Sequence, residues 1–587
     1  MLPHKQIESR LQSAVTAVLP GADVSSVLVR PCPDPKFGDY QANALMALAK
    51  ERKLNPRQLA TDVVARLDVS DICEKTEIAG AGFLNFRLKG AALAQALQEA
   101  ANGAHMFFEK AASPRTVVVD FSSPNVAKPM HVGHIRSTIL GDCLARALRL
   151  LGHRVITDNH IGDWGTQFGK LLVGWKTQLD PAALANEPLA EMERLYKAID
   201  AASKNDPAVL DQARAELVKL QGGDEENLRI WRHMIELSEE QFETVYRRLG
   251  VKFDHTYGES FYNARLKGVV EELKSKGIAR PSEGAMAVFS DGSLPQKQDP
   301  FLKQEDGEWK PNPALVLKSD GAANYTTTDL ATLAFRLEQF HPEEIVYVTD
   351  GRQQLHFQQL FSIFKRWHPE VTVKLAHVWF GSILGDDGKP FKTRSGETVK
   401  LQELLDEAEE RAFTVVSQKN TELSEEQRRE IARVVGLGAI KYADLLPNRQ
   451  SDYVFSWDKM LALNGNTAPY LQYAYSRIRS IFRKSGDDAA ITASTNMELQ
   501  GAEELVLAKY LLNFGTVLEA VAAEYRPNYL CNYLYELAGH FARFYENCPV
   551  LKAEPADRAR RLVLCRLTGQ VLKQGLEILG IETLEQM

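Results

Sequence analysis

Cysteine is scarce in this 587-residue chain, and long apolar runs and a strong excess of one charge are missing. The six cysteines are scattered with no Cys-x-x-Cys pair, so we expect neither a structural zinc site nor a disulfide framework. No run of about 18 apolar residues occurs, which argues against a membrane span. A net charge of −7 excludes a uniformly basic nucleic-acid binder but permits a local basic patch. The first residues lack the apolar core of a signal peptide, so we expect a cytoplasmic protein.

Two common nucleotide-binding motifs are also missing. The chain has no Gly-x-x-x-x-Gly-Lys-[Ser/Thr], which excludes a P-loop NTPase. It has no Gly-x-Gly-x-x-Gly after an apolar run, so a dinucleotide-dependent oxidoreductase is unsupported. Any nucleotide site must therefore be built differently.

The pattern between residues 117 and 165 predicts a strand, a loop, a helix and a second strand. Residues 117–121 and 154–158 are short runs rich in β-branched residues, and the apolar segment 135–151 ends at Gly152. Such a unit implies a parallel pair with a right-handed crossover, and ligands of such sheets bind beyond the carboxyl ends of the strands.

The tetrapeptide His131-Val132-Gly133-His134 stands at that position, where the helix begins. A helix N-terminus offers free N–H groups and partial positive charge to a phosphate. Gly133 lets a flat ligand approach the backbone. His131 and His134 can donate hydrogen bonds to phosphoryl oxygens, and Lys128 adds positive charge. The alternative is that both histidines are simple caps or surface residues.

A second basic segment, residues 388–396, is bounded by glycines and contains Lys389, Lys392, Thr393 and Arg394. Three cations in six residues suit a mobile clamp on a polyphosphate, although a solvated surface loop has the same composition.

Tyr325 and Asp329 form a candidate binding pair. They lie four residues apart and would share one face of a helix. From spacing alone, a capping box formed by Thr326 and Asp329 is the commoner explanation.

The organisation predicted from these patterns is a multidomain α/β protein. Its core would be a Rossmann-like parallel sheet that includes the apolar runs 315–317, 345–348 and 371–373. An α+β domain precedes this core, a helical insertion interrupts it, and an all-α helix bundle follows it. The expected boundaries are 1–112 for the N-terminal domain, 113–178 and 307–409 for the core, 179–306 for the insertion and 410–587 for the bundle.

Two features predict contacts with RNA. Tyr470, Tyr473 and Arg477 lie on one face of a helix in the bundle, and aromatic and arginine side chains suit unstacked bases and phosphates. Tyrosines in a helix core beside a solvated basic edge would look the same. Asn43 in the N-terminal domain is a candidate for RNA contact or, equally, a helix cap.

These motifs resemble the signatures of class I aminoacyl-tRNA synthetases. The strings 123–138 and 162–169 resemble arginyl-tRNA synthetases in particular, and the resemblance extends over nearly the entire chain. It implies ligation of L-arginine to tRNA(Arg) with ATP and Mg²⁺, activation that requires bound tRNA, and no membrane. A monomer is favoured. Lys389, Lys392 and Thr393 match the first lysine, second lysine and hydroxyl of the second signature, Lys-Met-Ser-Lys-Ser, whereas Pro390-Phe391 replaces Met-Ser.

The resemblance also implies roles for individual residues. Tyr325, Asp329 and Glu259 match family residues that read the guanidinium group, although Glu259 could equally be a surface carboxylate. His356 is assigned to the nucleotide side. Residues matching positions that hold the α-amino and nearby groups are Asp120, Asn125 and Gln353. Two rival functions are a non-catalytic RNA-binding paralogue and a class I ligase for another amino acid.

Overall fold

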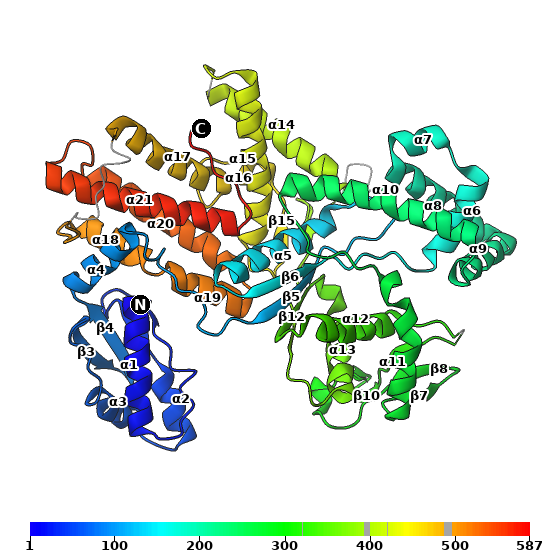
Figure 1. Ribbon diagram of the computed structural model, residues 1–587, viewed down its shortest axis with the longest axis horizontal. Coiled ribbons are helices and arrows are strands. Elements are labelled where there is room, and N and C mark those ends of the chain that lie inside the picture. The colour runs from blue at the N-terminus through cyan, green and yellow to red at the C-terminus, as the bar shows by residue number, and fades with distance from the viewer. Residues whose placement is uncertain (320, 392–398, 420, 487–495) are drawn as a thin grey trace. The chain divides into compact units, whose positions relative to one another are not determined.

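The computed structural model describes residues 1–319, 321–391, 399–419, 421–486 and 496–587 (Figure 1). The chain forms two compact units. The first, here the core unit, comprises Ser113–Val415 and Ala443–Lys459, and the second, the terminal unit, comprises Met1–Ala112, Val416–Tyr442 and Met460–Met587.

A four-stranded parallel sheet organises the core unit, in the order β13-β12-β5-β6. Helix α5 (Val132–Leu150) connects β5 to β6, and Gly152 follows it at φ 90°, as the apolar pattern predicted. The register places Asp120 opposite Asp158 on one side and Tyr347 on the other, so polar groups gather where the strands end. The strands are β5 (Thr116–Phe121), β6 (Arg154–Asp158), β12 (Glu344–Val348) and β13 (Lys374–His377).

Two strands expected in this sheet lie elsewhere. Residues 315–317 belong to β11 (Ala314–Leu317), which pairs antiparallel with β8 (Ala285–Val288) in a separate sheet of order β11-β8-β7. Residues 371–373 form no strand and precede β13. A short apolar run predicts burial but does not select a pairing partner, which explains both errors. The third strand of this sheet is β7 (Ala279–Ser282), and β9 (Leu302–Glu305) pairs with β10 (Glu308–Pro311) in a separate two-stranded sheet.

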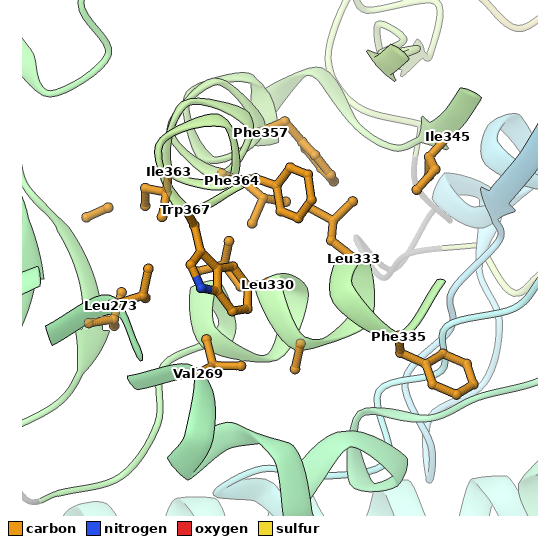
Figure 2. Close-up of a cluster of buried hydrophobic side chains, with 14 of the residues drawn as sticks. Val269, Leu273, Leu330, Leu333, Phe335, Ile345, Phe357, Ile363, Phe364 and Trp367 are labelled. Carbon is orange, nitrogen blue, oxygen red and sulfur yellow. The ribbon is translucent and has the colours of Figure 1, made fainter. Parts of the chain in front are cut away.

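A hydrophobic cluster joins the sheet to the helices that carry the candidate pocket (Figure 2). It packs α12 (Tyr325–Phe340) and α13 (Gln354–Trp367) against α11 (Asn263–Ser275) and the strands. Leu330 and Leu333 point into this cluster from α12, as Phe357 and Phe364 do from α13. Burial of these large side chains fixes both helices and thereby the polar residues in their first turns.

The helical insertion packs helix on helix. Its longest member, α10 (Glu225–Leu249), starts at Asp224, whose side chain accepts a hydrogen bond from the Asn227 N–H, and ends at Gly250 with φ 63°. The other helices are α6 (Gln167–Gln178), α7 (Pro181–Asn186), α8 (Pro188–Asn205) and α9 (Pro207–Gln221). Remaining elements of the chain between residues 250 and 460 are η1 (Glu259–Tyr262), η2 (Gln296–Gln298), η3 (Gly351–Gln353), β14 (Ile383–Leu384), α14 (Leu401–Lys419), α15 (Glu425–Leu445), β15 (Tyr453–Val454) and α16 (Trp457–Met460).

The terminal unit combines an α+β layer with a helix bundle. Its antiparallel sheet has the order β1-β2-β4-β3. Residues 502–524, which span α18 and α19, are long and apolar enough to cross a bilayer, but 56% of that window is buried inside the fold, as expected of core helices. The elements are α1 (Pro3–Val18), β1 (Arg30–Pro31), β2 (Tyr40–Ala42), α2 (Ala44–Glu51), α3 (Pro56–Val64), β3 (Cys73–Ala79), β4 (Phe83–Leu88), α4 (Gly90–Ala101), α17 (Ala468–Ser485), α18 (Ala502–Leu511), α19 (Phe514–Glu524), α20 (Asn528–Asn547) and α21 (Pro555–Ile578).

Candidate active site and RNA-contacting helices

Helix α5 begins with a reciprocal cap made by its two histidines. His131 is the N-cap residue, and its Nδ1 accepts a hydrogen bond from the Gly133 N–H at 3.1 Å. In return, Nδ1 of His134 accepts from the His131 N–H at 3.1 Å. Because Nδ1 accepts in both rings, the proton of each neutral imidazole must sit on Nε2. The cap thus leaves two Nε2–H donors, on rings whose centroids are 4.0 Å apart.

Both histidines are held neutral. Burial, with positive charge on Arg352 and Lys128, lowers the pKa of His131. Burial and the adjacent His131 lower the pKa of His134 to about 3. Neutral imidazoles can donate through Nε2–H at pH 7 without adding net charge.

Gly133 is required by the cap itself. A Cβ at this position would lie 2.9 Å from Cε1 and 3.0 Å from Nδ1 of the His131 ring. Any larger residue would therefore push the ring from the position in which it caps the helix. The Gly133 backbone is exposed, which also leaves it open to a ligand.

The loop between β5 and α5 carries two more predicted residues. The side chains of Asn125 and Lys128 are exposed, and Lys128 Nζ stands 5.2 Å from the centre of the Tyr196 ring. Asn125 pairs through its backbone with Gly162, and a Cβ at Gly162 would lie only 2.4 Å from Asn125 Oδ1. The Gly162-Asp163 segment thus allows Asn125 to adopt this position.

The second basic loop is described only in part. The exposed Lys389 donates its N–H to Asp387 Oδ1 at 3.0 Å in a turn closed by Gly385 N–H to Lys389 O at 2.8 Å. Lys392 and Thr393 lie outside the described residues. Where the chain resumes, Val399 O accepts from the Val132 N–H at 2.9 Å. The carboxyl-side flank of the loop is therefore joined to the start of α5.

Tyr325 and Asp329 lie in the first turns of α12, as predicted. The N-cap is Asn324, whose side chain accepts from the Tyr325 N–H, so the capping-box interpretation of Thr326 and Asp329 is wrong. Asp329 Oδ2 instead lies 2.6 Å from Nε2 of His356. The Tyr325 and His356 rings meet edge to face at 4.7 Å.

His356 thus contacts Asp329 and Tyr325, two residues predicted to read the guanidinium group, and its assignment to the nucleotide side stays a prediction. Nothing in the local sequence indicated this pairing, because 27 residues separate His356 from Asp329. The packing of α12 against α13 brings them together.

Glu259 is a half-buried carboxylate in η1. Burial raises its pKa to about 7; His160 lowers it, while Asp329 and Asp163 raise it. The contribution of Asp329 to this shift indicates that the two carboxylates lie near each other. Two neighbouring carboxylates with the imidazole of His356 suit a planar cation with several N–H donors.

Asp120 is buried in an ion-pair network that the sequence did not reveal. Arg336, fully buried on α12, donates from one Nη to Asp120 Oδ2 at 2.6 Å and to Asp158 Oδ2 at 2.8 Å. Ser123 Oγ donates to the other Asp120 oxygen at 3.2 Å. Arg336 balances the two carboxylates where β5 and β6 end. Gln353, the last residue of η3, is exposed.

The predicted RNA-contacting residues all lie in the terminal unit. Tyr473 is 48% exposed on α17, and the Tyr470 ring is 5.6 Å from Tyr535 on α20. The Arg477 guanidinium lies 5.2 Å from the Tyr545 ring. Tyr535 and Tyr545 were not predicted, because their proximity arises only from the packing of α17 on α20.

Asn43 occupies the N-cap position of α2, but its side chain makes no capping hydrogen bond and is exposed. The structure thus places Asn43 at a helix cap without a side-chain capping bond, and its contact with RNA stays a prediction. Among the residues that the structure describes, no three His, Cys, Asp or Glu side chains converge as a metal-binding group.

Comparison with known proteins relates all these regions to one family. The family model described as tRNA synthetases class I (R), catalytic domain, matches residues 95–457. The model of the arginyl tRNA synthetase N-terminal domain matches residues 5–88, and that of the DALR anticodon binding domain matches residues 471–587.

Individual relatives cover the chain from end to end. It is 47% identical to an arginine–tRNA ligase of Chromobacterium violaceum, with 100% of both chains covered, and 45% identical to one of Proteus mirabilis, with 99% of both covered. Among solved structures, an arginyl-tRNA synthetase of Plasmodium falciparum is 30% identical, with a TM-score of 0.81 and coverage of 100% of this chain and 99% of that one. One of Thermus thermophilus is 26% identical, with a TM-score of 0.82 and full coverage of both chains.

Proposed function

Because the chain belongs to the arginyl-tRNA synthetase family, we propose that it joins L-arginine to tRNA(Arg) at the expense of ATP, through an arginyl-adenylate. The observation that carries this function is the placement of two groups at one edge of the parallel sheet. The histidine cap follows β5, and the pocket residue His356 follows β12, the neighbour of β5. The carboxyl ends of parallel strands share an edge, so the phosphate-binding and cation-binding groups face one region.

In the first step, the arginine carboxylate attacks the α-phosphorus of ATP. A new P–O bond forms, the bond to the bridging oxygen breaks, and pyrophosphate leaves. The Nε2–H groups of His131 and His134 donate to the phosphoryl oxygens as negative charge develops there. Lys128, Lys389, Lys392 and Thr393 hold the polyphosphate, and Gly133 lets the nucleotide approach the backbone. The carboxylate is already ionised, so positioning and charge stabilisation suffice without a general base.

The acidic pocket selects arginine. Asp329, Glu259 and Tyr325 read the guanidinium, the two carboxylates as hydrogen-bond acceptors. His356 orients Asp329 and is assigned to the nucleotide side. Lysine lacks the planar fork, and a neutral isostere would leave half-buried carboxylates unpaired. Residues assigned to the α-amino end of arginine are Asp120, Asn125 and Gln353. Arg336 holds the Asp120 side chain in place through its hydrogen bond to Oδ2.

In the second step, the terminal ribose hydroxyl of the tRNA attacks the carbonyl of the adenylate, and AMP leaves with the hydroxyl proton. The N-terminal domain (1–112, with Asn43) and the helical domain (410–587, with Tyr470, Tyr473 and Arg477) bind the tRNA. Residues 113–178 and 307–409 form the catalytic core, and residues 179–306 form its insertion. Mg²⁺ accompanies ATP as part of the substrate, and arginine activation requires bound tRNA. A cytoplasmic monomer is the state we assign.

The test is ATP–pyrophosphate exchange with arginine, with and without total tRNA. We expect exchange only when tRNA is present. Asp329→Ala should raise the KM for arginine strongly, whereas Glu338→Gln, on the exposed side of the same helix in an ion pair with Arg265, should behave as the wild type. Unchanged exchange by Asp329→Ala at subsaturating arginine would remove the arginine assignment.

Other outcomes separate the alternatives. Exchange without tRNA keeps the ligase but removes its dependence on RNA. Exchange with another amino acid instead of arginine would mean that Asp329 and Glu259 do not select arginine. No exchange with any amino acid favours a non-catalytic RNA-binding protein.

A further inference from the structure

The loop that leads from β5 into α5 has an unusual backbone. Ser122, Ser123 and Ala127 adopt φ values of 74°, 51° and 61°, in the left-handed region that residues with a Cβ rarely occupy. Such conformations persist only where the surroundings enforce them. This loop carries Asn125 and Lys128 and ends at the cap of α5, so its conformation determines where these groups stand.

Helix α10 of the insertion contacts both ends of this loop. Helix α5 adds two hydrogen bonds at Ser122, whose N–H donates to Ser137 Oγ and whose Oγ accepts from Thr138 Oγ1, each at 2.8 Å. The hydroxyls of Tyr246 and Ser122 lie 2.8 Å apart, and Asn159 Nδ2 donates to the Tyr246 hydroxyl at 3.1 Å. Two turns earlier in the helix, Ser238 Oγ accepts from the Ala127 N–H at 3.0 Å. One helix therefore holds both ends of the loop, at the same residues that adopt left-handed backbone.

These contacts are buried. Ser238 is 0% exposed and Tyr246 is 3% exposed. Inside the helix, Ser238 Oγ donates to Met234 O at 2.7 Å, which leaves its lone pairs for Ala127. A buried hydroxyl with this geometry gives a directional contact that an apolar side chain of similar size cannot replace.

The same helix is anchored beyond the loop. Arg248, two residues after Tyr246, forms ion pairs with Asp406 at 2.7 Å and Glu409 at 2.8 Å on α14, the helix that follows the second basic loop. The position of Tyr246 is therefore fixed by a helix that contacts the loop after β5 and forms ion pairs with α14. A fixed helix can impose a strained conformation on a loop, whereas a mobile one cannot.

We propose that Tyr246 and Ser238 are positioning residues for adenylate formation, which hold residues 122–128 in the conformation that presents Asn125, Lys128 and His131 to the substrates. This inference rests on the proposed ligase function. Neither hydroxyl touches a reacting atom. Loss of either hydroxyl should lower the turnover number for amino-acid activation while the protein stays folded, because only the loop would relax toward ordinary backbone.

The test compares Tyr246→Phe and Ser238→Ala with a matched control, Ser203→Ala. Ser203 is also a buried insertion serine, and its hydroxyl donates to the carbonyl of Asp200 within its own helix. In ATP–pyrophosphate exchange with arginine and tRNA, we expect kcat to fall about tenfold in Tyr246→Phe and in Ser238→Ala, equivalent to about 1.4 kcal/mol of barrier. Ser203→Ala should keep the wild-type kcat, and thermal unfolding should show the same folded fraction in all four proteins.

A rescue experiment separates positioning from a general structural effect. Ala127→Gly makes left-handed backbone accessible without the tether from Ser238. The double variant Ala127→Gly/Ser238→Ala should therefore recover part of the kcat lost in Ser238→Ala, although it removes a further buried methyl group.

Several results would overturn the proposal. A kcat within twofold of wild type for both Tyr246→Phe and Ser238→Ala would show that the loop needs neither hydroxyl. A loss of activity that follows the loss of folded protein, or that Ser203→Ala shares, would reduce both residues to structural roles. Absence of exchange in the wild-type protein would instead refute the ligase function on which the inference depends.

Discussion

The arginine pocket makes the affinity for arginine depend on pH in a way that follows from Glu259. Burial raises the pKa of this carboxyl from 4.5 to about 7. A shift of this size means that ionising Glu259 in the free protein costs about 3 kcal/mol more than in water. Between pH 4.5 and 7 the folded state therefore binds more protons than the unfolded state, so this group makes the fold less stable as pH rises through that window.

Arginine reverses that balance, because a guanidinium that stays charged at all accessible pH values stabilises the ionised form. Only protein with ionised Glu259 should bind arginine well, so the KM for arginine should fall about tenfold between pH 6 and pH 8. The His134 ring should not contribute to this slope, since its pKa is lowered to about 3 and the ring stays neutral over the range. The pKa of His131 is lowered as well.

The assay is exchange at saturating ATP and tRNA with varied arginine, at pH 6.0, 7.0 and 8.0. Glu259→Gln should raise the KM for arginine by about 10- to 100-fold at pH 8 and remove its pH dependence. Glu239→Gln is the matched control, because Glu239 also has a pKa raised by burial but is not assigned to the pocket. A flat profile in the wild type, or an unchanged slope in Glu259→Gln, would refute the reasoning.

Three further predictions follow from other parts of the molecule. Gly133→Ala should lower kcat for exchange by about tenfold or more, because the new methyl group would displace the His131 ring from its cap. Steady-state kinetics would check this, and the KM for tRNA should stay at the wild-type value as a control. Tyr473→Ala should raise the KM for tRNA by about tenfold or more without changing the unfolding midpoint, since loss of one stacked base typically costs about 1–3 kcal/mol. Burial lowers the pKa of His4 to about 3, so the unfolded chain takes up the proton first and the free energy of unfolding decreases as pH falls below 6.5. At pH 5 urea unfolding of the terminal unit should show a loss of about 2 kcal/mol from this group. His4→Leu should abolish this part of the pH dependence.

Much of the fold and part of the site were predictable because they depend on local patterns. The apolar period and Gly152 predicted α5, and the spacing of Tyr325 and Asp329 predicted one face of α12. The strands β5, β6 and β12 were also correct. The apolar runs at 315–317 and 371–373 were assigned wrongly, since burial alone does not determine which strands pair.

The sequence by itself determined the end of α5 at Gly152, the helical faces and the family resemblance, because these rest on residues within about one or two helical turns of each other or on long strings of identity. The tertiary structure alone decided which distant groups meet: His356 on Asp329, Arg336 between Asp120 and Asp158, and Tyr246 and Ser238 on the loop after β5. These contacts span 27 to 216 residues of chain. No local rule encodes them, because each exists only after the packing of apolar helix faces has brought two separate segments within hydrogen-bonding distance.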